Sequence, residues 1–428
     1  REGGARREGA PGGLRVNRRP RPPPAGVTEW MVMKDVALDD QAERAEEQAK
    51  AAEHMKWDPA CKVEDAELTA VDAAIRAVAC GNDVVVTCSS RPAVKVWKVA
   101  EAKLVESQSL RYGAVGSSCV EVAGDSHTVA ACGDDGAIGL WDLRANKRTG
   151  ELGASISIAW KAKFLPNGRQ LVSGGPSGAL NVWDLRMNRL ETEIAADGLA
   201  PKGEDRDATK RRRKDPRAAD RPEGAVDGKK PGPIYSLAAS GDGRLLGCGR
   251  GSGEISVMRL EGHEWVGNVS AHMGGQAAPV RALVFDSASR LLLSGGDDNH
   301  VCLVDAASWA RQRPEGVARS PHMERFSAHR MWVTSVSTCP DPSRRVVVTT
   351  SWDATVKLWD YCTHTLLCSY KEHADSVFAS AFAPVHGRFF VTAGVDAAVA
   401  LYVAKHDLGA APTDATNEAM LVPVAGGM

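Results

Sequence analysis

Three histidine–aspartate pairs are the residues whose types could do chemistry in this chain: His272 with Asp298, His329 with Asp353, and His373 with Asp396. A histidine beside a carboxylate can serve as a general base, with the carboxylate orienting the imidazole. All three pairs, however, recur at the same place in a repeated sequence pattern. This recurrence favours a structural role over catalysis.

Other catalytic motifs are missing from the sequence. It contains no G-x-S-x-G, H-E-x-x-H or P-loop pattern, and the GRGSG stretch at 249–253 falls in a turn of the repeat. The ten cysteines include no C-x-x-C and are scattered through apolar segments, as expected for buried thiols in a reducing compartment. We therefore predict a protein that is not an enzyme and that has no cofactor, metal site or disulfide framework.

Charge and hydropathy exclude two further classes of protein. The chain of 428 residues has 53 Lys and Arg against 54 Asp and Glu, a formal net charge of −1. This balance argues against nucleic acid as the main ligand, and no run of about 18 apolar residues predicts a membrane span. A local basic run, Lys210–Lys214, is typical of nuclear import or nucleic-acid patches, but a solvated loop explains it equally well.

A short strand pattern recurs seven times between residues 72 and 404. In the fold, this repeated unit would position the three histidine–aspartate pairs. Each copy has an apolar strand, a second apolar strand that runs into small and acidic residues, and a third strand that ends on a large residue. The large residues are Trp97, Trp141, Trp183, Met258, Val304, Trp359 and Tyr402. Their spacing is about 42 to 46 residues except at two insertions, and several third strands end in Trp-Asp. This period and ending predict an all-β fold, a seven-bladed WD40 β-propeller.

The sixth copy, which we call blade 6, has the complete set of residues that holds a strong WD40 repeat together. His329, Asp353 and Trp359 match the hydrogen-bonded tetrad, and either Thr349 or Ser351 would supply its hydroxyl. Blades 5 and 7 keep their histidine and aspartate, and blade 2 keeps only Asp135. Blades 1, 3 and 4 have Arg91, Ser177 and Ser252 at the aspartate position, so their turns must be held in another way.

The segments around the repeats differ from them in composition. We predict a disordered extension at 1–33, an acidic helix at 34–56, the propeller at 57–406 with a disordered charged insertion at 196–232, and a flexible tail at 407–428. Met31 and Met33 are candidate start residues. Because the last blade lacks a fourth strand, we expect a strand from Lys56–Leu68 to close the ring. The charged insertion joins blades 3 and 4 on the top face, and a smaller insertion at 309–321 lies on the bottom.

The top face is the predicted site for a partner. In a propeller, this face has the loops that join successive blades and the turns between second and third strands. Its aromatic and arginine content is typical of a binding hot spot, although any single residue could instead pack between loops. The predicted partner-binding residues are Arg76, Ser118, Trp160, Tyr235, Arg281, Trp332, Thr334, Trp352 and Phe378.

Several stretches carry a more specific resemblance. VTCSSRPAVKVWK in blade 1, ISIAWKAKFLPNGRQLVSGGPSGALNVWD in blade 3 and SWDATVKLWD in blade 6 look similar to the WD-repeat subunit shared by the superkiller (Ski) and polymerase-associated factor (Paf) complexes. The order of weak and strong blades is similar too. The resemblance implies a non-catalytic scaffold, monomeric within a hetero-complex, that docks a helical-repeat (TPR) partner. It also implies roles in cytoplasmic 3′–5′ mRNA decay and nuclear transcription elongation.

Other WD40 adaptors remain open as alternatives. These are a ubiquitin-ligase substrate receptor, a ribosome-bound scaffold and a histone-tail reader. A histone-tail reader would need acidic residues around the channel mouth, and the sequence indicates no such ring. A propeller hydrolase would need polar or metal-binding residues along the tunnel, and the fold by itself does not exclude one.

Overall fold

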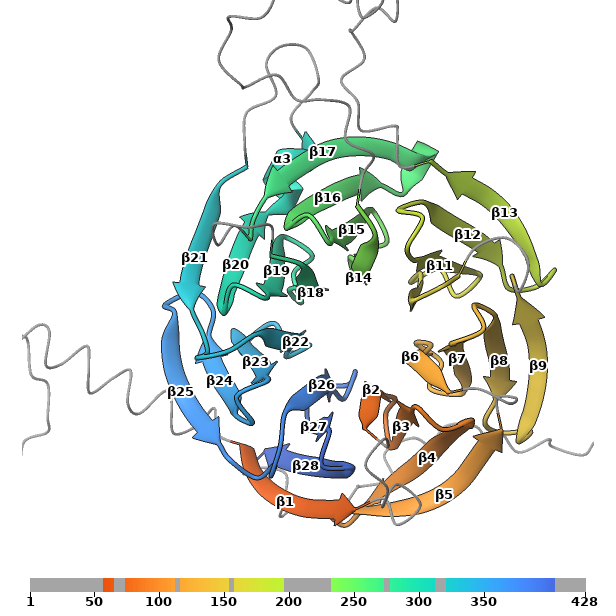
Figure 1. Cartoon of the computed structure of the whole chain (residues 1–428), viewed down its shortest axis with the longest axis vertical. Coiled ribbons are helices and arrows are strands. Elements are labelled where there is room, and N and C mark those ends of the chain that lie inside the picture. The colour runs from red at the N-terminus through yellow and green to blue at the C-terminus, as the bar shows by residue number, and fades with distance from the viewer. Residues whose placement is uncertain are drawn as a thin grey trace, which may run out of the picture. The chain divides into compact units, whose positions relative to one another are not determined.

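Seven four-stranded antiparallel sheets surround a central channel in the computed structural model (Figure 1). The structure describes residues 57–64, 74–111, 116–153, 158–195, 232–272, 278–311 and 321–404. The chain divides into two units, Arg1–His54 and Met55–Met428, and every described residue lies in the second. The predicted extension, the acidic helix, the tail and nearly all of the charged insertion, with Lys210–Lys214, lie outside the described residues.

Each blade contributes one strand to each of four concentric layers. The innermost strands are β2 (Ile75–Cys80), β6 (Ser117–Val122), β10 (Lys161–Phe164), β14 (Ile234–Ala239), β18 (Val280–Phe285), β22 (Val333–Thr338) and β26 (Val377–Phe382). The second strands are β3 (Val84–Ser89), β7 (Thr128–Gly133), β11 (Gln170–Gly174), β15 (Leu245–Arg250), β19 (Leu291–Gly296), β23 (Val346–Ser351) and β27 (Phe389–Gly394).

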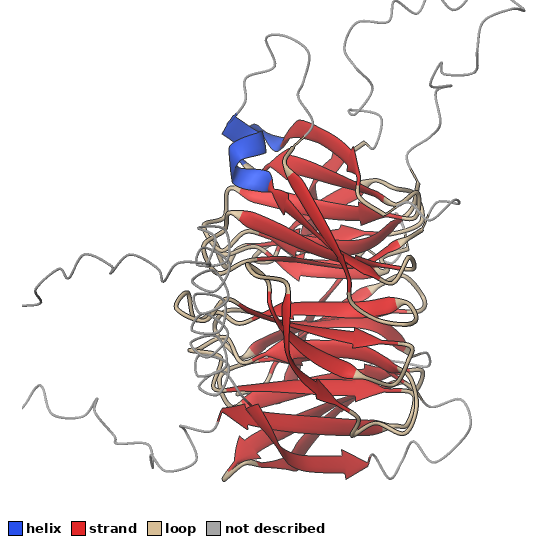
Figure 2. Cartoon of the chain, turned by 90° about the vertical axis from the view of Figure 1, so that its left-hand side faces the viewer, coloured by secondary structure: helices blue, strands red, loops and turns tan. Residues whose placement is uncertain are grey.

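The two outer layers complete the blades. The third strands are β4 (Ala93–Ala100), β8 (Ile138–Asp142), β12 (Leu180–Asp184), β16 (Glu254–Arg259), β20 (His300–Asp305), β24 (Val356–Asp360) and β28 (Ala398–Ala404). The outermost strands are β5 (Lys103–Arg111), β9 (Lys147–Leu152), β13 (Arg189–Ile194), β17 (Glu264–Ser270), β21 (Met323–Ser327), β25 (Thr365–Tyr370) and β1 (Trp57–Glu64). From the side, loops and turns gather on the two faces of this disk (Figure 2).

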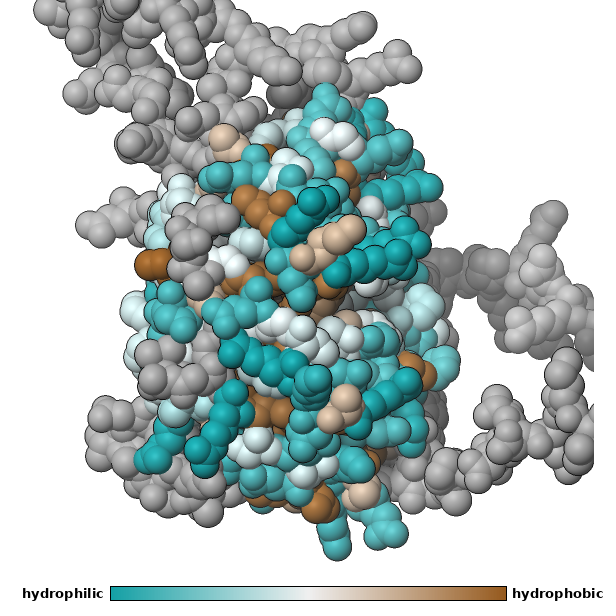
Figure 3. All heavy atoms as spheres, turned by 90° about the vertical axis from the view of Figure 1, so that its right-hand side faces the viewer, coloured by the Kyte–Doolittle hydropathy of each residue, from teal (hydrophilic) through white to brown (hydrophobic). Residues whose placement is uncertain are grey.

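Burial explains the composition of each layer. Every residue of β15, β23 and β27 is buried, because these second strands are covered on both faces by neighbouring blades. Such strands are near-continuous runs of Val, Leu, Phe, Thr and small residues. The outer strands, for example β13, have mostly exposed or half-buried residues, and the edge of the disk in Figure 3 is largely hydrophilic.

Ring closure takes place in blade 7, as the sequence predicts. β1 comes from the Lys56–Leu68 segment and pairs antiparallel with β28, from Trp57 opposite Ala404 to Glu64 opposite Ala398. Trp57 is 1% exposed and donates a 3.1 Å hydrogen bond from Nε1 to the carbonyl of Gly387. The first described strand therefore covers the edge that the last blade would otherwise expose.

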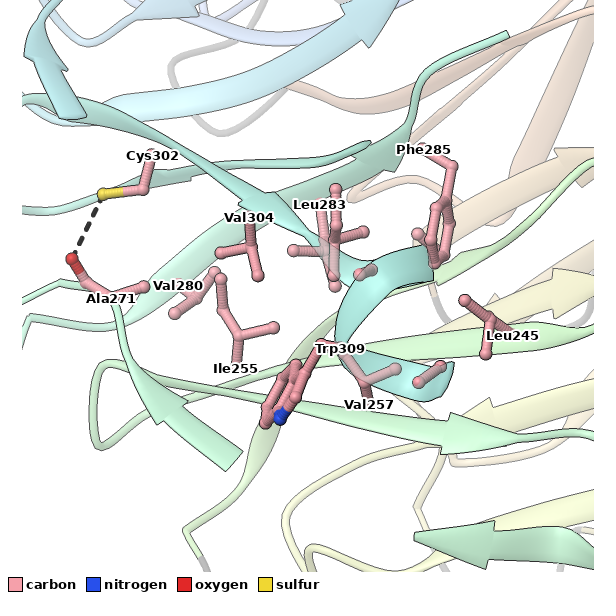
Figure 4. Packing of buried hydrophobic residues seen from close by; sticks show 14 residues of the cluster. Leu245, Ile255, Val257, Ala271, Val280, Leu283, Phe285, Cys302, Val304 and Trp309 are labelled. Carbon is pink, nitrogen blue, oxygen red and sulfur yellow. Dashed lines mark hydrogen bonds between the residues drawn. The ribbon is translucent and has the colours of Figure 1, made fainter. Parts of the chain in front are cut away.

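One helix in the propeller is not predicted by the sequence. α3 (Ala306–Arg311) lies in the connection from β20 to β21, partly inside the predicted insertion at 309–321, and residues 312–320 lie outside the described residues. Its Trp309 is buried in the cluster between blades 4 and 5, near Val257 (Figure 4). Gly267 makes this packing possible, because a Cβ there would lie 2.8 Å from the Trp309 ring. The 3-10 turn η3 (Glu261–His263) joins β16 to β17.

Candidate partner-binding face

A β-bulge near the start of the innermost strand recurs in six blades. The ladder between first and second strands skips one residue in each of them, namely Arg76, Ser118, Tyr235, Arg281, Thr334 and Phe378. A bulge leaves its extra residue unpaired and redirects its side chain. In blade 3, Trp160 precedes β10, and its backbone N–H donates to the carbonyl of Gly174 at 2.9 Å. Six of the seven blades therefore have a β-bulge at the predicted partner-binding residue of the innermost strand, and blade 3 does not.

Aromatic rings and one guanidinium meet on the side of blades 3 to 5. The rings of Trp160 and Tyr235 have centroids 5.4 Å apart. Arg281 lies over Tyr235 at 5.5 Å and over Trp332 at 5.3 Å, as in cation–π contacts. Its Nε and Nη2 donate to the two carboxylate oxygens of Asp297 at 2.7 and 2.8 Å. These hydrogen bonds raise the pKa of Arg281 and fix its guanidinium between the two rings.

A second aromatic group continues from Trp332 across blades 6 and 7. The rings of Trp332 and Trp352 lie edge to face with centroids 4.8 Å apart, and Trp352 meets Phe378 in the same way at 5.8 Å. The backbone N–H of Trp352 donates to the carbonyl of Trp332 at 3.1 Å. Trp332 is 38% exposed and Trp352 41% exposed. Six residues thus form one continuous row, which we call the aromatic arc: Trp160, Tyr235, Arg281, Trp332, Trp352 and Phe378.

The remaining predicted partner-binding residues lie outside the arc and bond to the protein itself. Arg76 is exposed and donates from Nη1 to both carboxylate oxygens of Asp134, at 3.0 and 2.8 Å. Ser118 donates to the carbonyl of Trp160 at 3.3 Å, and Thr334 donates to the carbonyl of Val377. Ser118 and Thr334 therefore join neighbouring blades, while Arg76 presents a neutralised ion pair.

Two exposed apolar residues beside the arc are not among the predicted partner-binding residues. Ile158 is 49% exposed and Met331 is 46% exposed, and both lie just before an innermost strand, as Trp160 and Trp332 do. Both lie within two positions of a tryptophan that was predicted to bind the partner, and this closeness in sequence could have identified them. The GRGSG turn also contributes to the arc, since a Cβ on Gly251 would lie 2.9 Å from Cε2 of Tyr235. Its glycine leaves room for a ring and does not form a phosphate loop.

The tetrad of blade 6 is a chain of hydrogen bonds. Trp359 Nε1 donates to Thr349 Oγ1 at 3.0 Å, and Thr349 Oγ1 lies 2.7 Å from His329 Nε2. His329 Nδ1 lies 3.2 Å from the Asp353 carboxylate. Because the tryptophan can only donate and the carboxylate only accept, the hydroxyl donates to Nε2 and Nδ1–H donates to Asp353. Of the two hydroxyls that the sequence left open, Thr349 is the member of the chain.

The other blades keep different parts of this chain. His272 and His373 lie 2.8 and 2.9 Å from their aspartates in blades 5 and 7. Blades 1 and 3 keep only the inner part, in which Trp97 donates to Thr87 and Trp183 to Ser173. In blade 4, the fully buried Arg250 donates to Ser256 Oγ at 2.8 Å and to the carbonyls of Gly178 and Gly232 at 3.4 and 3.1 Å. In blade 4, where Ser252 occupies the aspartate position, the hydrogen bonds of Arg250 therefore replace those of the tetrad.

The pKa values of His329 and Asp353 fit a structural role for the tetrad. Burial lowers the pKa of His329 more than Asp353 raises it, so the imidazole is neutral at pH 7. For Asp353, burial raises the pKa, but hydrogen bonds from His329 and Thr355 outweigh burial and hold the pKa well below its usual range. His329 is 5% exposed and all of its ring nitrogens are engaged. Such a histidine has no free nitrogen to offer a substrate.

The central channel has a volume of about 390 Å³ and is lined by the innermost strands. Several hydroxyls on its wall are used between blades: Ser236 donates to the carbonyl of Val280 at 2.9 Å, and Ser337 to that of Ser380 at 2.8 Å. Within the described ranges, no group of three or more His, Cys, Asp or Glu side chains could hold a metal ion. The carboxylates of Asp134 and Asp297 on the top side are each paired with an arginine.

Comparison with known families matches two stretches of the chain. The family model for the WD domain, G-beta repeat, covers residues 254–305 and 321–360. These stretches contain the innermost, second and third strands of blades 5 and 6, which hold His272 with Asp298 and His329 with Asp353. The fold is a seven-bladed WD40 β-propeller. The prediction of the fold class from sequence is confirmed.

WD40 propellers are typically non-enzymatic scaffolds that bind other proteins, and no catalytic family is indicated for this chain. Across the described ranges, the helices of this propeller are too short to traverse a bilayer. The binding role of the arc stays a prediction. What the structure adds is that its six residues, spread over more than 200 positions of sequence, contact one another in succession.

Proposed function

We propose that this WD40 propeller is a non-catalytic scaffold that docks a protein partner on the aromatic arc. The observation that carries this proposal is the continuous contact from Trp160 to Phe378, which includes two tryptophans about two-fifths exposed. Trp, Tyr and Arg are the residues that dominate binding energy at protein interfaces. Their mutual packing restricts their rotamers before binding, which lowers the entropy cost of association.

We further propose that the scaffold is a subunit of a Ski-type mRNA decay complex, a Paf-type transcription elongation complex, or both. The resemblance of blades 1 to 7 to the WD-repeat subunit shared by these complexes supports this proposal. The partner on the arc would then be a helical-repeat (TPR) subunit, with the propeller as a single copy within the hetero-complex. Work in both settings requires a protein present in nucleus and cytoplasm.

The arc argues against the alternative in which the top face reads a cationic side chain, as in a histone-tail reader. Recognition of such a ligand needs open aromatic faces near a carboxylate. Here Arg281 already fills the space between Tyr235 and Trp332 and pairs with Asp297. The face is therefore better suited to an apolar or aromatic side chain, which would contact Trp332 and Trp352.

Affinity purification with matched variants tests the proposal. The wild-type chain should recover a TPR protein with an RNA helicase, elongation-complex subunits, or both sets. The double variant Trp332→Ala/Trp352→Ala should lose them, while Val385→Ala should retain them, because Val385 is similarly exposed but lies in a first-to-second-strand loop on the bottom face. Recovery of a cullin adaptor or of ribosomes instead would contradict membership of either complex. Retention of all partners by the double variant would contradict docking on the arc.

A further inference from the structure

Two cysteines lie directly opposite each other at the inner end of blade 2. Cys119 in β6 pairs with Cys132 in β7, immediately after the bulge at Ser118. Opposite residues in an antiparallel ladder have Cβ atoms about 4.5–5.5 Å apart, and a disulfide needs about 3.5–4.5 Å. Both thiols are free in the structure. A displacement of about 1 Å would therefore join them.

The surroundings of this pair favour a thiolate on Cys119. The neighbouring Cys132 thiol lowers the pKa of Cys119 most, burial opposes this effect, and the ammonium group of Lys161 in blade 3 adds to the lowering. The Cys119 Sγ lies 4.0 Å from the carbonyl oxygens of Val120 and Ala162. The pKa of Cys132 is raised well above its usual value. Glu121, which would disfavour the thiolate, is paired with Lys163. Cys119 lines the central channel and Cys132 is fully buried, so Cys119 is the thiol that a molecule in the channel meets first.

Other buried cysteines do not share the lowered pKa of Cys119. Burial raises the pKa of Cys88 to about 12, with the charge of Cys119 adding to the effect, although Lys161 acts on Cys88 as well. Burial likewise raises the pKa of Cys248, in blade 4, to about 12. At neutral pH such thiols have almost no thiolate, which is the form that attacks peroxide, so neither is expected to start the reaction.

Cys119 is also within reach of small molecules. It is 7% exposed and lines the central channel together with Lys161, whereas Cys132 is fully buried behind it. A hydroperoxide as small as hydrogen peroxide could approach Cys119 from the channel. Oxidation of a thiolate beside a second thiol follows a known order, in which the sulfenic acid forms first and then condenses with its neighbour.

We propose that Cys119 is an oxidation site for hydrogen peroxide, with Cys132 as its resolving cysteine. In the first step, the Cys119 thiolate attacks one peroxide oxygen, the O–O bond breaks, and Cys119 sulfenic acid and hydroxide form. In the second step, the Cys132 sulfur attacks the Cys119 sulfur, the S–O bond breaks, and a disulfide and water form. The peroxide is reduced by two electrons and the two thiols are oxidised by two. This site goes beyond the scaffold role and does not depend on it.

Peptide mapping of the folded full-length chain after peroxide treatment tests this site. Limited hydrogen peroxide at neutral pH, followed by alkylation and mass spectrometry, should give a Cys119–Cys132 linked peptide. The variant Cys132→Ser should instead accumulate sulfenic acid at Cys119, which dimedone labels. Lys161→Met should slow the reaction by up to roughly tenfold, since one pKa unit changes the thiol–thiolate equilibrium tenfold. The exposed Cys362 is the internal reference for accessibility.

Two outcomes would overturn the proposal. One is that Cys362 reacts while Cys119 stays reduced until the chain is unfolded by urea, which would show that the channel admits no oxidant. The other is that peroxide oxidises Cys119 in the folded wild-type chain but no Cys119–Cys132 linked peptide forms, which would show that Cys132 does not resolve the sulfenic acid. Thermal unfolding monitored by circular dichroism, run on each variant, ensures that the rates compare folded proteins.

Discussion

The indole of Trp332 lies edge to face against the indole of Trp352, with ring centroids 4.8 Å apart and planes at 84°. The two residues are 20 positions apart and belong to the loop before blade 6 and to a turn within it. Because each ring is held by the other and both are partly exposed, the pair offers a preformed apolar surface in the blade 6 part of the aromatic arc.

Replacing Trp352 with alanine should weaken partner binding without unfolding the propeller. Loss of a hot-spot tryptophan typically costs about 2 kcal/mol or more of binding free energy, roughly thirtyfold in Kd. Titration calorimetry with the purified partner measures this change, and Val385→Ala is the control for an exposed apolar residue on the other face. An unchanged Kd for Trp352→Ala would remove this residue from the interface.

The triple variant Trp160→Ala/Arg281→Ala/Phe378→Ala tests whether the arc binds or packs. We expect partner binding to disappear while the far-ultraviolet spectrum and a cooperative thermal transition persist, since all three side chains are only half-buried. Asp297 loses its arginine in this variant, so a modest decrease in stability is expected. Loss of the folded state would show that these residues serve packing between loops.

Thr349→Val should be about twice as destabilising as the same substitution in blade 1. In blade 6 it leaves both Trp359 Nε1 and His329 Nε2 without a partner, whereas Thr87→Val leaves only Trp97 Nε1. Each unsatisfied buried group costs about 1–3 kcal/mol, so the blade 6 variant should lose about twice as much free energy of unfolding. Urea denaturation of the two variants provides the comparison. Equal losses would mean that His329 contributes nothing through this bond.

Acidification should destabilise the propeller over two pH ranges. The pKa of His329 is lowered in the folded state, so the unfolded chain takes up this proton first as the pH falls through about 6.5, and the free energy of unfolding decreases. For Asp396, burial raises the pKa, but hydrogen bonds from His373 and Ala374 bring it to about 2. Its stabilising effect is complete above about pH 4 and is lost between about 4 and 2.

Unfolding midpoints measured from pH 7 to pH 2 check both ranges. Asp396→Asn should be less stable at neutral pH and should show a shallower decrease below pH 4. A decrease below pH 4 as steep as that of the wild type would show that this carboxylate does not link folding to pH.

Trp57→Ala should open the ring at its closure. The side chain is 1% exposed, contacts Phe382 and Phe390, and donates to the carbonyl of Gly387, so its removal should cost about 3–5 kcal/mol. A chain that starts after Glu64 should lose cooperative unfolding, whereas one that starts at Trp57 should keep it. Calorimetry measures both truncations, and a stable ring without β1 would contradict closure by this strand.

The sequence by itself determined the architecture of this protein. Short runs such as VVVTCSS and FFVTAGVD repeat at a fixed interval, and a run of that composition is stable only when neighbouring sheets cover both of its faces. The missing fourth strand of blade 7 likewise predicted closure by residues near Trp57. The tetrad of blade 6 could also be predicted from the sequence, because its members occupy set positions in the repeat.

Only the tertiary structure decided which residues meet. That Arg281 lies between Tyr235 and Trp332, or that Asp134 of blade 2 pairs with Arg76 of blade 1, depends on how neighbouring blades are placed side by side. Helix α3 was hidden because its Trp309 is buried only where Gly267 of a neighbouring strand leaves room for the ring. The channel position of Cys119 and its lysine neighbour arose in the same way, since contacts between blades join residues some 40 positions apart that no local pattern connects.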